Sequence, residues 1–492
     1  MGRVRGQQGG VAVSGSTDRG DGSPARLARD SVGFGHILFF VVAAAAPLTA
    51  VVGASPAAIA FGNGPGVPGA FILSGCLYLL FSVGFTAMSR HIPGGGAFYR
   101  YITRGLGKPA GFGAALMVLT AYNSMQTAIY ALLGVFAQSA LGPLGIGLPW
   151  WAYSLGALVL VTLLGRLRIG FSGGLLGACM TAEALILVLL DLGIVLHGGG
   201  PEGMDATALR PATVFAPGLG AALVFVVGSY TGFEATAIFA EEARDARRTV
   251  PRATFAAVLL ITVLYAASTW AITAYYGPTH IKDVAHSAAD TMFFTAADAV
   301  LGHWASVTMN VLLIISLFAC VLSFHSTISR YYFALGREGT WPRILGTTDP
   351  VHQAPRAAGL LQSVVVAALL LAFVASRQDP YAIIFAWMSV LAVLGILAVQ
   401  LLVSLAVVVF FRRSGGEGAW TGAVAPLLSS LGLGIAIALV IDNIALMAGS
   451  DSLVVRLFPP FMALVGLGGG LYAWSLRRRD PARYAALGQS YE

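Results

Sequence analysis

Two carboxylates, Glu183 and Glu234, stand inside long apolar runs of this chain. An acidic residue within a membrane span is a functional hypothesis by default, because burying its charge is expensive. Glu183 lies near the centre of GACMTAEALILVLLDLGIVL, a run without a basic residue. Burial there favours the neutral acid, so this carboxyl could bind and release a proton, or serve as a structural hydrogen-bonding partner. Glu234 could also couple transport to protons. Alternatively, it could face an aqueous vestibule or form hydrogen bonds to broken backbone.

Glu234 follows an interruption in its apolar run, FVVGSYTG at 225–232, and the chain carries a similar interruption, AVVGASP, at 50–56. Irregular backbone at membrane depth survives only where it lines a cavity or is buried in protein. Paired Gly/Pro-interrupted spans point to an inverted-repeat transporter with a site near the midplane. The alternative is that these glycines let helices pack closely.

Such breaks could hold a zwitterion without any charged side chain. Pro56 suits the first position of a half-helix that Ser55 could cap, and the positive end of that half-helix would attract a carboxylate. Freed carbonyl groups would attract an ammonium. We therefore expect substrate-binding residues at both breaks: Val52, Gly53, Ala54, Ser55, Ala57, Gly228, Ser229, Tyr230, Thr231 and Gly232. Since neither break carries a carboxylate, such a site would favour a zwitterion without net charge over a polycation.

The elements that position these residues are membrane spans. The 492 residues are 57% apolar and only 10% charged, with a mean hydropathy of +0.79, far from the composition of a soluble protein. The sequence predicts an all-α integral membrane protein with twelve transmembrane helices. They fall at about 36–62, 67–89, 110–140, 148–166, 171–197, 217–241, 251–276, 299–335, 357–376, 380–411, 420–447 and 453–476.

The basic residues predict the orientation of these spans. Every Lys and Arg lies in the tails or in alternate loops on one side, except Arg210, Lys282, Arg377 and Arg456. The positive-inside rule then places both termini in the cytoplasm and the chain in the cell membrane. We expect a disordered tail over 1–31, a transporter domain over 32–480 and a second cytoplasmic tail over 481–492. The net charge of +7 follows this topology and indicates no nucleic-acid partner.

Other functional classes lack support in the sequence. The chain contains no HExxH, GxSxG or P-loop motif, and its histidines and three cysteines show no metal-ligand spacing. We expect no enzyme activity, no cofactor and no metal.

Three cytoplasmic motifs carry a family resemblance. They are RHIPGGGAFYRYITRGLGKPAGF after the second span, GFEATAIFAEEARDARRTVPRA at the sixth, and SRYYFALGREGTWPRILG after the eighth. Together they resemble the bacterial amino acid permeases of the amino acid-polyamine-organocation (APC) superfamily. The resemblance implies a LeuT-type 5+5 inverted repeat (about 36–197 and 217–411) plus two additional helices (about 420–476). Spans 1 and 6 would be discontinuous, and amino acids or amines would move by alternating access across the lipid bilayer.

The resemblance also implies roles for further residues. Asn123 and Gln126 on span 3 and Trp387 on span 10 are candidates for the pocket that holds the substrate side chain. Sodium-coupled relatives hold their ion near span 8, where this chain offers Ser323, Ser326 and Thr327. Proton-coupled relatives can carry a lysine in span 5, and this span has none.

The charged run after span 6 is either a solvated loop or an inside gate. As a gate, Glu241 and Glu242 would pair with arginines such as Arg247 and Arg330 and release them during alternation. The leading prediction is a secondary active importer of amino acids, coupled to protons or possibly sodium. The alternatives are an exchanger or exporter of amines or polyamines, and a membrane sensor without transport.

Overall fold

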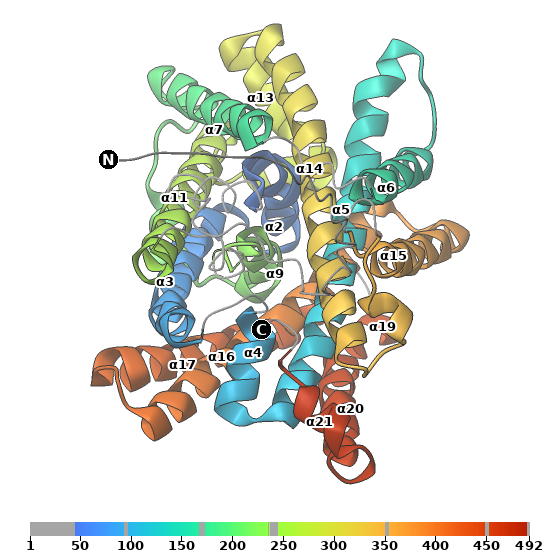
Figure 1. The fold of residues 1–492 in the computed structure, drawn as a ribbon. Coiled ribbons are helices and arrows are strands. Elements are labelled where there is room, and N and C mark those ends of the chain that lie inside the picture. The colour runs from blue at the N-terminus through green and yellow to red at the C-terminus, as the bar shows by residue number, and fades with distance from the viewer. Residues whose placement is uncertain are drawn as a thin grey trace, which may run out of the picture.

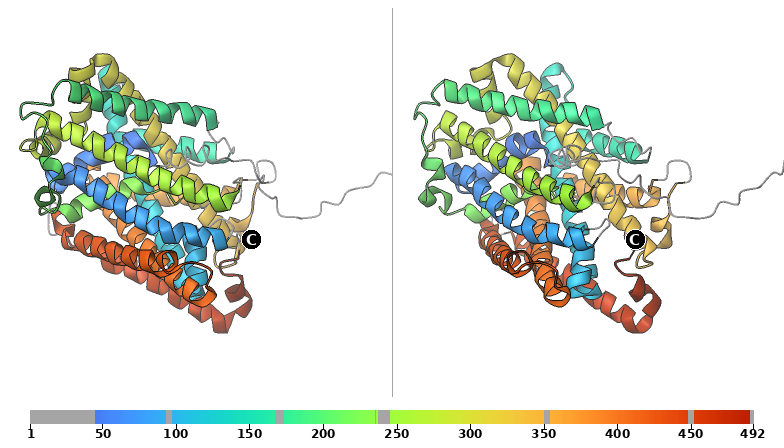
Figure 2. Two further views of the ribbon diagram at one scale, coloured as in Figure 1. Left: turned by 90° about the vertical axis from the view of Figure 1, so that its left-hand side faces the viewer. Right: turned by 60° about the vertical axis from the view of Figure 1, so that its left-hand side comes forward.

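The computed structural model describes residues 45–92, 97–166, 173–234, 236, 245–349, 354–447 and 452–489, and all the regular elements among them are helical. Figure 1 shows these helices gathered into one bundle, and Figure 2 shows the long ones running side by side. The α-helices of the first half are α2 (Ser55–Phe61), α3 (Val67–His91), α4 (Ala97–Leu106), α5 (Lys108–Leu141), α6 (Trp150–Arg166), α7 (Gly173–Leu196), α8 (Pro211–Val214) and α9 (Leu219–Tyr230).

The second half continues with helices of more varied length. They are α11 (Ala246–Tyr276), α12 (Ile281–Ala288), α13 (Met292–Leu301), α14 (His303–Arg337), α15 (Arg356–Ser376), α16 (Ala386–Ser414), α17 (Ala425–Asp442), α18 (Ile444–Met447), α19 (Leu453–Arg456), α20 (Phe458–Arg479) and α21 (Pro481–Ala486). Three π-helical stretches, η1 (Thr49–Ala54), η7 (Pro380–Phe385) and η8 (Trp420–Val424), lead directly into α2, α16 and α17, and short 3-10 turns are η2 (Gly64–Gly66), η3 (Gly142–Leu144), η4 (Thr207–Leu209) and η6 (Arg343–Gly346).

Nine helices in the described part of the chain are long and apolar enough to cross a membrane. Three shorter apolar helices, Thr49–Phe61, Trp150–Arg166 and Leu219–Tyr230, fall at the predicted first, fourth and sixth spans. The chain is thus a multi-pass membrane protein. The predicted eighth span starts later than expected, at His303, because Gly302 has φ +95° and separates α13 from α14.

Helix α5 lies at the centre of the packing. It contacts α4, α6, α14, α16 and α20, while α3 packs along α11 and α2 packs on α9. Small residues make the closest of these contacts possible: a Cβ atom added to Gly113 of α5 would lie 2.3 Å from the carbonyl oxygen of Gly466 in α20. Because lipid provides no hydrophobic driving force between helices, such close packing, together with interhelical hydrogen bonds, helps to hold them together.

Candidate functional site

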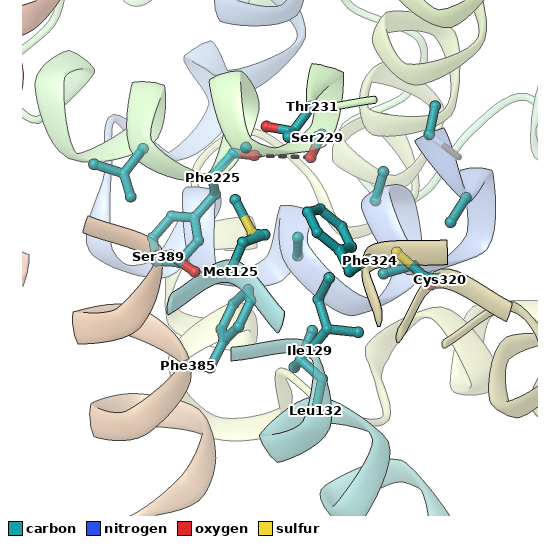
Figure 3. Close-up of a pocket in the computed structure, with 17 residues that line it drawn as sticks. Met125, Ile129, Leu132, Phe225, Ser229, Thr231, Cys320, Phe324, Phe385 and Ser389 are labelled. Carbon is teal, nitrogen blue, oxygen red and sulfur yellow. Dashed lines mark hydrogen bonds between the residues drawn. The ribbon is translucent and has the colours of Figure 1, made fainter. Parts of the chain in front are cut away.

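A small cavity lies where η1, α5, α9, α14 and the start of α16 meet (Figure 3). Its volume is about 40 Å³, enough for a few water molecules. The wall is mostly apolar and carries no charged side chain; it consists of Ala45, Ala46, Thr49, Ala50, Ala54, Met125, Ile129, Leu132, Val224, Phe225, Gly228, Ser229, Thr231, Cys320, Phe324, Phe385 and Ser389. Any larger ligand would require these side chains to move.

The first interrupted segment forms one side of this cavity. Its backbone has a positive φ of 45° at Ala46 and then runs as a π-helix into α2. Wider π-helical turns occur often at functional sites, and here the carbonyl oxygen of Gly53 accepts a hydrogen bond from the Tyr381 hydroxyl at 3.0 Å. The expectation that Ser55 caps a new half-helix is wrong. Because the helix continues through this point, the Ser55 hydroxyl donates instead to the carbonyl oxygen of Val51 at 2.6 Å.

The end of α9 forms the opposite side. The helix stops at Tyr230, Thr231 is extended, and Gly232 has φ +118°, a conformation that glycine adopts readily. Thr231 is 5% exposed and lines the cavity, and its hydroxyl has no hydrogen-bond partner among the described residues. A buried hydroxyl without a partner is costly, so Thr231 is well suited to bind a ligand that enters the cavity.

The structure brings together only some of the residues expected to bind substrate. Ala54, Gly228, Ser229 and Thr231 line the cavity. The other expected residues lie outside its wall: Val52, Gly53, Ser55, Ala57, Tyr230, Gly232, Asn123, Gln126 and Trp387.

Several of these outlying residues are held by other partners. The Tyr230 hydroxyl bonds the carbonyl oxygen of Phe71 and the hydroxyl of Thr262, so it points toward α3 and α11. The Asn123 amide donates to the Tyr332 hydroxyl at 3.3 Å. The Gln126 amide donates to the carbonyl oxygen of Val321 at 2.9 Å.

Glu183 lies close behind the cavity wall. Its Oε2 atom accepts hydrogen bonds from the Ser316 hydroxyl at 2.8 Å and from the Leu48 amide at 3.4 Å. The Ser316 hydroxyl in turn accepts from the hydroxyl of Thr49, at 3.2 Å, and Thr49 lines the cavity. Glu183 is buried, with an exposed fraction of 3%. A continuous chain of hydrogen bonds therefore joins Glu183 on α7 to the cavity.

Glu234 is held at the second break. Its Oε1 atom accepts from the Tyr122 hydroxyl at 2.7 Å, and Oε2 accepts from the amide of Gly232 at 2.9 Å. Of the roles open to Glu234 from the sequence, bonding to broken backbone is therefore observed, and the same carboxylate ties this break to α5.

The remaining candidates lie away from the cavity. Ser323 and Ser326 are on the exposed face of α14 and Thr327 is half-buried. Arg247 and Arg330 are exposed, whereas Glu241 and Glu242 lie outside the described residues. The described part of the chain holds no group of three or more His, Cys, Asp or Glu residues that could bind a metal ion.

Sequence reasoning missed much of the cavity wall, above all Thr49, Met125, Phe324 and Ser389. One available signal was the helical spacing of Met125, Ile129 and Leu132, which places them on one face of α5. Thr49 and Ser389 carried no such signal, since isolated hydroxyl residues are common in membrane helices.

Comparisons with known proteins agree with the three sequence motifs. A model of the amino acid permease family matches residues 36–452. The low-affinity putrescine importer PlaP of Escherichia coli is 24% identical over 314 residues, which cover 60% of this chain and 66% of the importer. The Asc-type amino acid transporter 1 of Homo sapiens is 28% identical over 309 residues, covering 58% of this chain and 55% of that protein. The probable GABA permease of Pseudomonas aeruginosa is 24% identical over 314 residues, covering 61% and 64% respectively.

The matches thus span 55% to 66% of the length of these relatives. Fold and composition define an all-helical, multi-pass membrane protein. The chain belongs to the amino acid permease family of the APC superfamily, which confirms the resemblance seen in its motifs.

Proposed function

We propose that the chain is a secondary active transporter that imports amino acids across the cytoplasmic membrane by alternating access, coupled to protons. Family membership supports this proposal, as do the printed names of the relatives, which include a putrescine importer, a GABA permease and an amino acid transporter. All three names describe small molecules that carry an amine.

The packing supports twelve spans with a five-plus-five repeat, in which spans 1 to 5 correspond to spans 6 to 10. Helices that would be counterparts pack on each other: α2 on α9, α3 on α11, α5 on α14, and α6 on α15. Pairs within one half recur in the other, because α5 packs on α6 as α14 packs on α15. The pair α5 and α16 is likewise matched by α14 and α7. Exchanging each helix for its counterpart therefore preserves these pairs, as a two-fold repeat requires.

The cavity favours a neutral amino acid as the substrate. Its wall carries hydroxyl groups from Thr49, Ser229, Thr231 and Ser389 but no charged side chain. A diamine such as putrescine would bring two ammonium groups into this low dielectric with no carboxylate to pair them, which is unfavourable. An α-amino acid needs only backbone groups and hydroxyls for its charged end and apolar contacts for its side chain.

The observation that carries proton coupling is the hydrogen-bond chain from Glu183 to the cavity. An ionised carboxylate only accepts hydrogen bonds, as Glu183 does here from Ser316 and Leu48. A protonated carboxyl would keep one accepting oxygen, lose the charge that strengthens these two bonds, and gain an O–H group that needs an acceptor near η1 or α14. Protonation would thus bias the position of the segment that lines the cavity, which is what coupling requires.

Reconstitution in liposomes tests this proposal. We expect one or more labelled neutral amino acids to accumulate when an inward proton gradient is imposed and to equilibrate without it, while putrescine does not accumulate. Exchange that ignores the gradient would favour an antiporter. Accumulation of putrescine, or uptake driven only by sodium, would contradict the proposed substrate or the proposed coupling ion.

A further inference from the structure

The chain does not leave the bundle where its last long helix ends. After α20 ends at Arg479, residues 481–489, here called the strap, form the short helix α21 and then continue to Gln489. Figure 1 shows α21 folded back beside the end of α20. A tail with no role would be expected to extend into solvent, so the contacts of the strap call for an explanation.

The helical part of the strap is bound by Lys108 at the start of α5. The Lys108 ammonium donates to the carbonyl oxygens of Tyr484 at 3.0 Å and Ala485 at 2.7 Å, and it lies 5.2 Å from the centre of the Tyr484 ring. A cation bound to the last carbonyls of a helix is favourable, because those groups have no partner within the helix. Leu487, directly after α21, is 1% exposed and belongs to the hydrophobic core.

The end of the strap reaches α14. The amide of Gly488 donates to Oε1 of Glu338 at 2.9 Å, and the other oxygen of Glu338 accepts from the Tyr99 hydroxyl at 2.7 Å. Gly488 has φ +78°, and a Cβ atom there would lie 2.9 Å from Cγ2 of Thr103 in α4. Glycine is therefore required at this position both by its backbone and by the proximity of α4.

The strap thus joins elements that the proposed repeat places in different halves: α4 and α5 in the first, and the end of α14 in the second. Its anchors Tyr99 and Glu338 lie in two of the three family motifs, GGGAFYR and GREG. Elements of the two halves must move relative to one another if access alternates. A ligand-like segment that binds only one arrangement favours that arrangement by its own binding free energy.

We propose that the strap is an autoinhibitory restraint: it holds the ends of α4, α5 and α14 together and must release before the cavity opens toward the side on which it lies. This inference rests on the proposed alternation of access, but its test requires neither transport nor knowledge of the substrate. Cys320 provides the reporter, since it lines the cavity and is 4% exposed. Its thiol reacts with a maleimide only when the cavity opens.

The test compares two variants that place the same new side chain at different positions of the strap, in a background where Cys76 and Cys179 are replaced by serine. Leu487→Asp introduces a charge at the buried anchor and releases the strap. Ala482→Asp is the matched control, because Ala482 is exposed in the first turn of α21, where an acidic residue is favourable. Trypsin cleavage after Arg483 reports whether the strap is released.

A membrane-impermeant maleimide is applied from the side of the strap. We expect Leu487→Asp to be cleaved faster at Arg483 and to label at Cys320 about fivefold faster or more, with Ala482→Asp like the parent. Unchanged or slower labelling in a variant with faster cleavage would overturn the proposal.

A shortened chain ending at Arg479 is labelled in parallel, so that the proposal stays testable if Leu487→Asp does not fold. Unchanged labelling in the shortened chain would also overturn it. Absence of transport would contradict the proposed function without affecting this result.

Discussion

At the scale of single residues, the position of one hydroxyl group links the cavity to Glu183. The Ser316 hydroxyl donates its only proton to the carboxylate and accepts from Thr49. This polarity suits an ionised Glu183, whose charge strengthens the bond, and protonation of the carboxyl would remove that charge and weaken the bond. Ser316 is therefore the residue through which protonation would be sensed at the cavity wall.

Replacing Ser316 by alanine should uncouple the two sites. Hydrogen bonds to charged groups contribute about 1.5–3 kcal/mol, so we expect proton-driven uptake by Ser316→Ala to fall about tenfold or more while exchange of substrate continues. Ser323→Ala is the matched control, because Ser323 lies on the exposed face of the same helix. Equal driven uptake by Ser316→Ala and the parent in reconstituted liposomes would argue against the link. If the parent showed sodium-driven uptake and Ser323→Ala lost it, the sodium site considered from the sequence would be supported instead.

The sequence identified Glu183 but not the residues around it. A carboxylate in an apolar run is conspicuous because burying its charge is expensive. Ser316 and Thr49 lie far from Glu183 in the chain, and only tertiary packing brings them to it. Glycines and hydroxyls at the breaks indicated the right segments of the chain. However, only four of the thirteen residues expected to bind substrate line the cavity: Ala54, Gly228, Ser229 and Thr231.

At the scale of helices, a buried polar cluster joins α5, α6, α14 and α15. The His325 ring bonds the side chain of Gln362, which bonds that of Gln126. Two glycines make room for the imidazole: a Cβ atom at Gly165 would lie 2.5 Å from Nε2 of His325, and one at Gly359 would lie 3.3 Å from it. His325 is therefore a packed, hydrogen-bonded residue. It lies between helices that correspond to each other in the proposed repeat, α5 to α14 and α6 to α15.

Filling this space should destabilise the bundle. We expect Gly165→Ala to lower the free energy of unfolding by about 1–3 kcal/mol, because the imidazole is held in place and cannot yield to the new methyl group. Gly156→Ala on the same helix meets nothing within 4 Å, so it should be neutral or stabilise by up to about 1 kcal/mol. Thermal unfolding in detergent measures both. Similar melting temperatures for the two variants would mean that the helices separate easily at His325.

Helix positions followed from the sequence more closely than helix ends did. Long apolar runs predicted the spans now seen as α3, α5 and α15 within a few residues. The start of α14 was missed because Gly302 is one of many glycines, and only its positive φ shows that it ends a helix. Ser55 was expected at a helix start because Ser-Pro is typical there, whereas the π-helix before it lets the helix continue.

At the scale of the whole molecule, the distribution of arginine predicts an orientation. Basic residues concentrate in the tails and alternate loops, so both ends of the chain should face the cytoplasm. We expect epitope tags at residue 1 and residue 492 to resist protease added to intact cells and to be cleaved after permeabilisation. A tag in the loop at 198–205 should show the opposite pattern. Cleavage of either terminal tag in intact cells would invert the proposed topology and the side assigned to the strap.

The family was predictable from the whole sequence because its motifs are local and lie in order along the chain. The arrangement around the cavity was not, since it depends on which faces of five separate elements meet. The contacts of the strap had no signal in the sequence: residues 481–492 were expected to be a cytoplasmic tail. Its partners Lys108, at the start of α5, and Glu338, at the end of α14, lie far from it in the chain.

The central claim is that Glu183 couples protons to the transport of amino acids, and Glu183→Gln tests it most directly. Glutamine keeps the size and the accepting oxygen of the side chain but cannot release a proton. In liposomes, the variant should lose accumulation driven by an inward proton gradient while exchanging internal for external substrate as the parent does. Gradient-driven accumulation by Glu183→Gln at the rate of the parent would contradict the account.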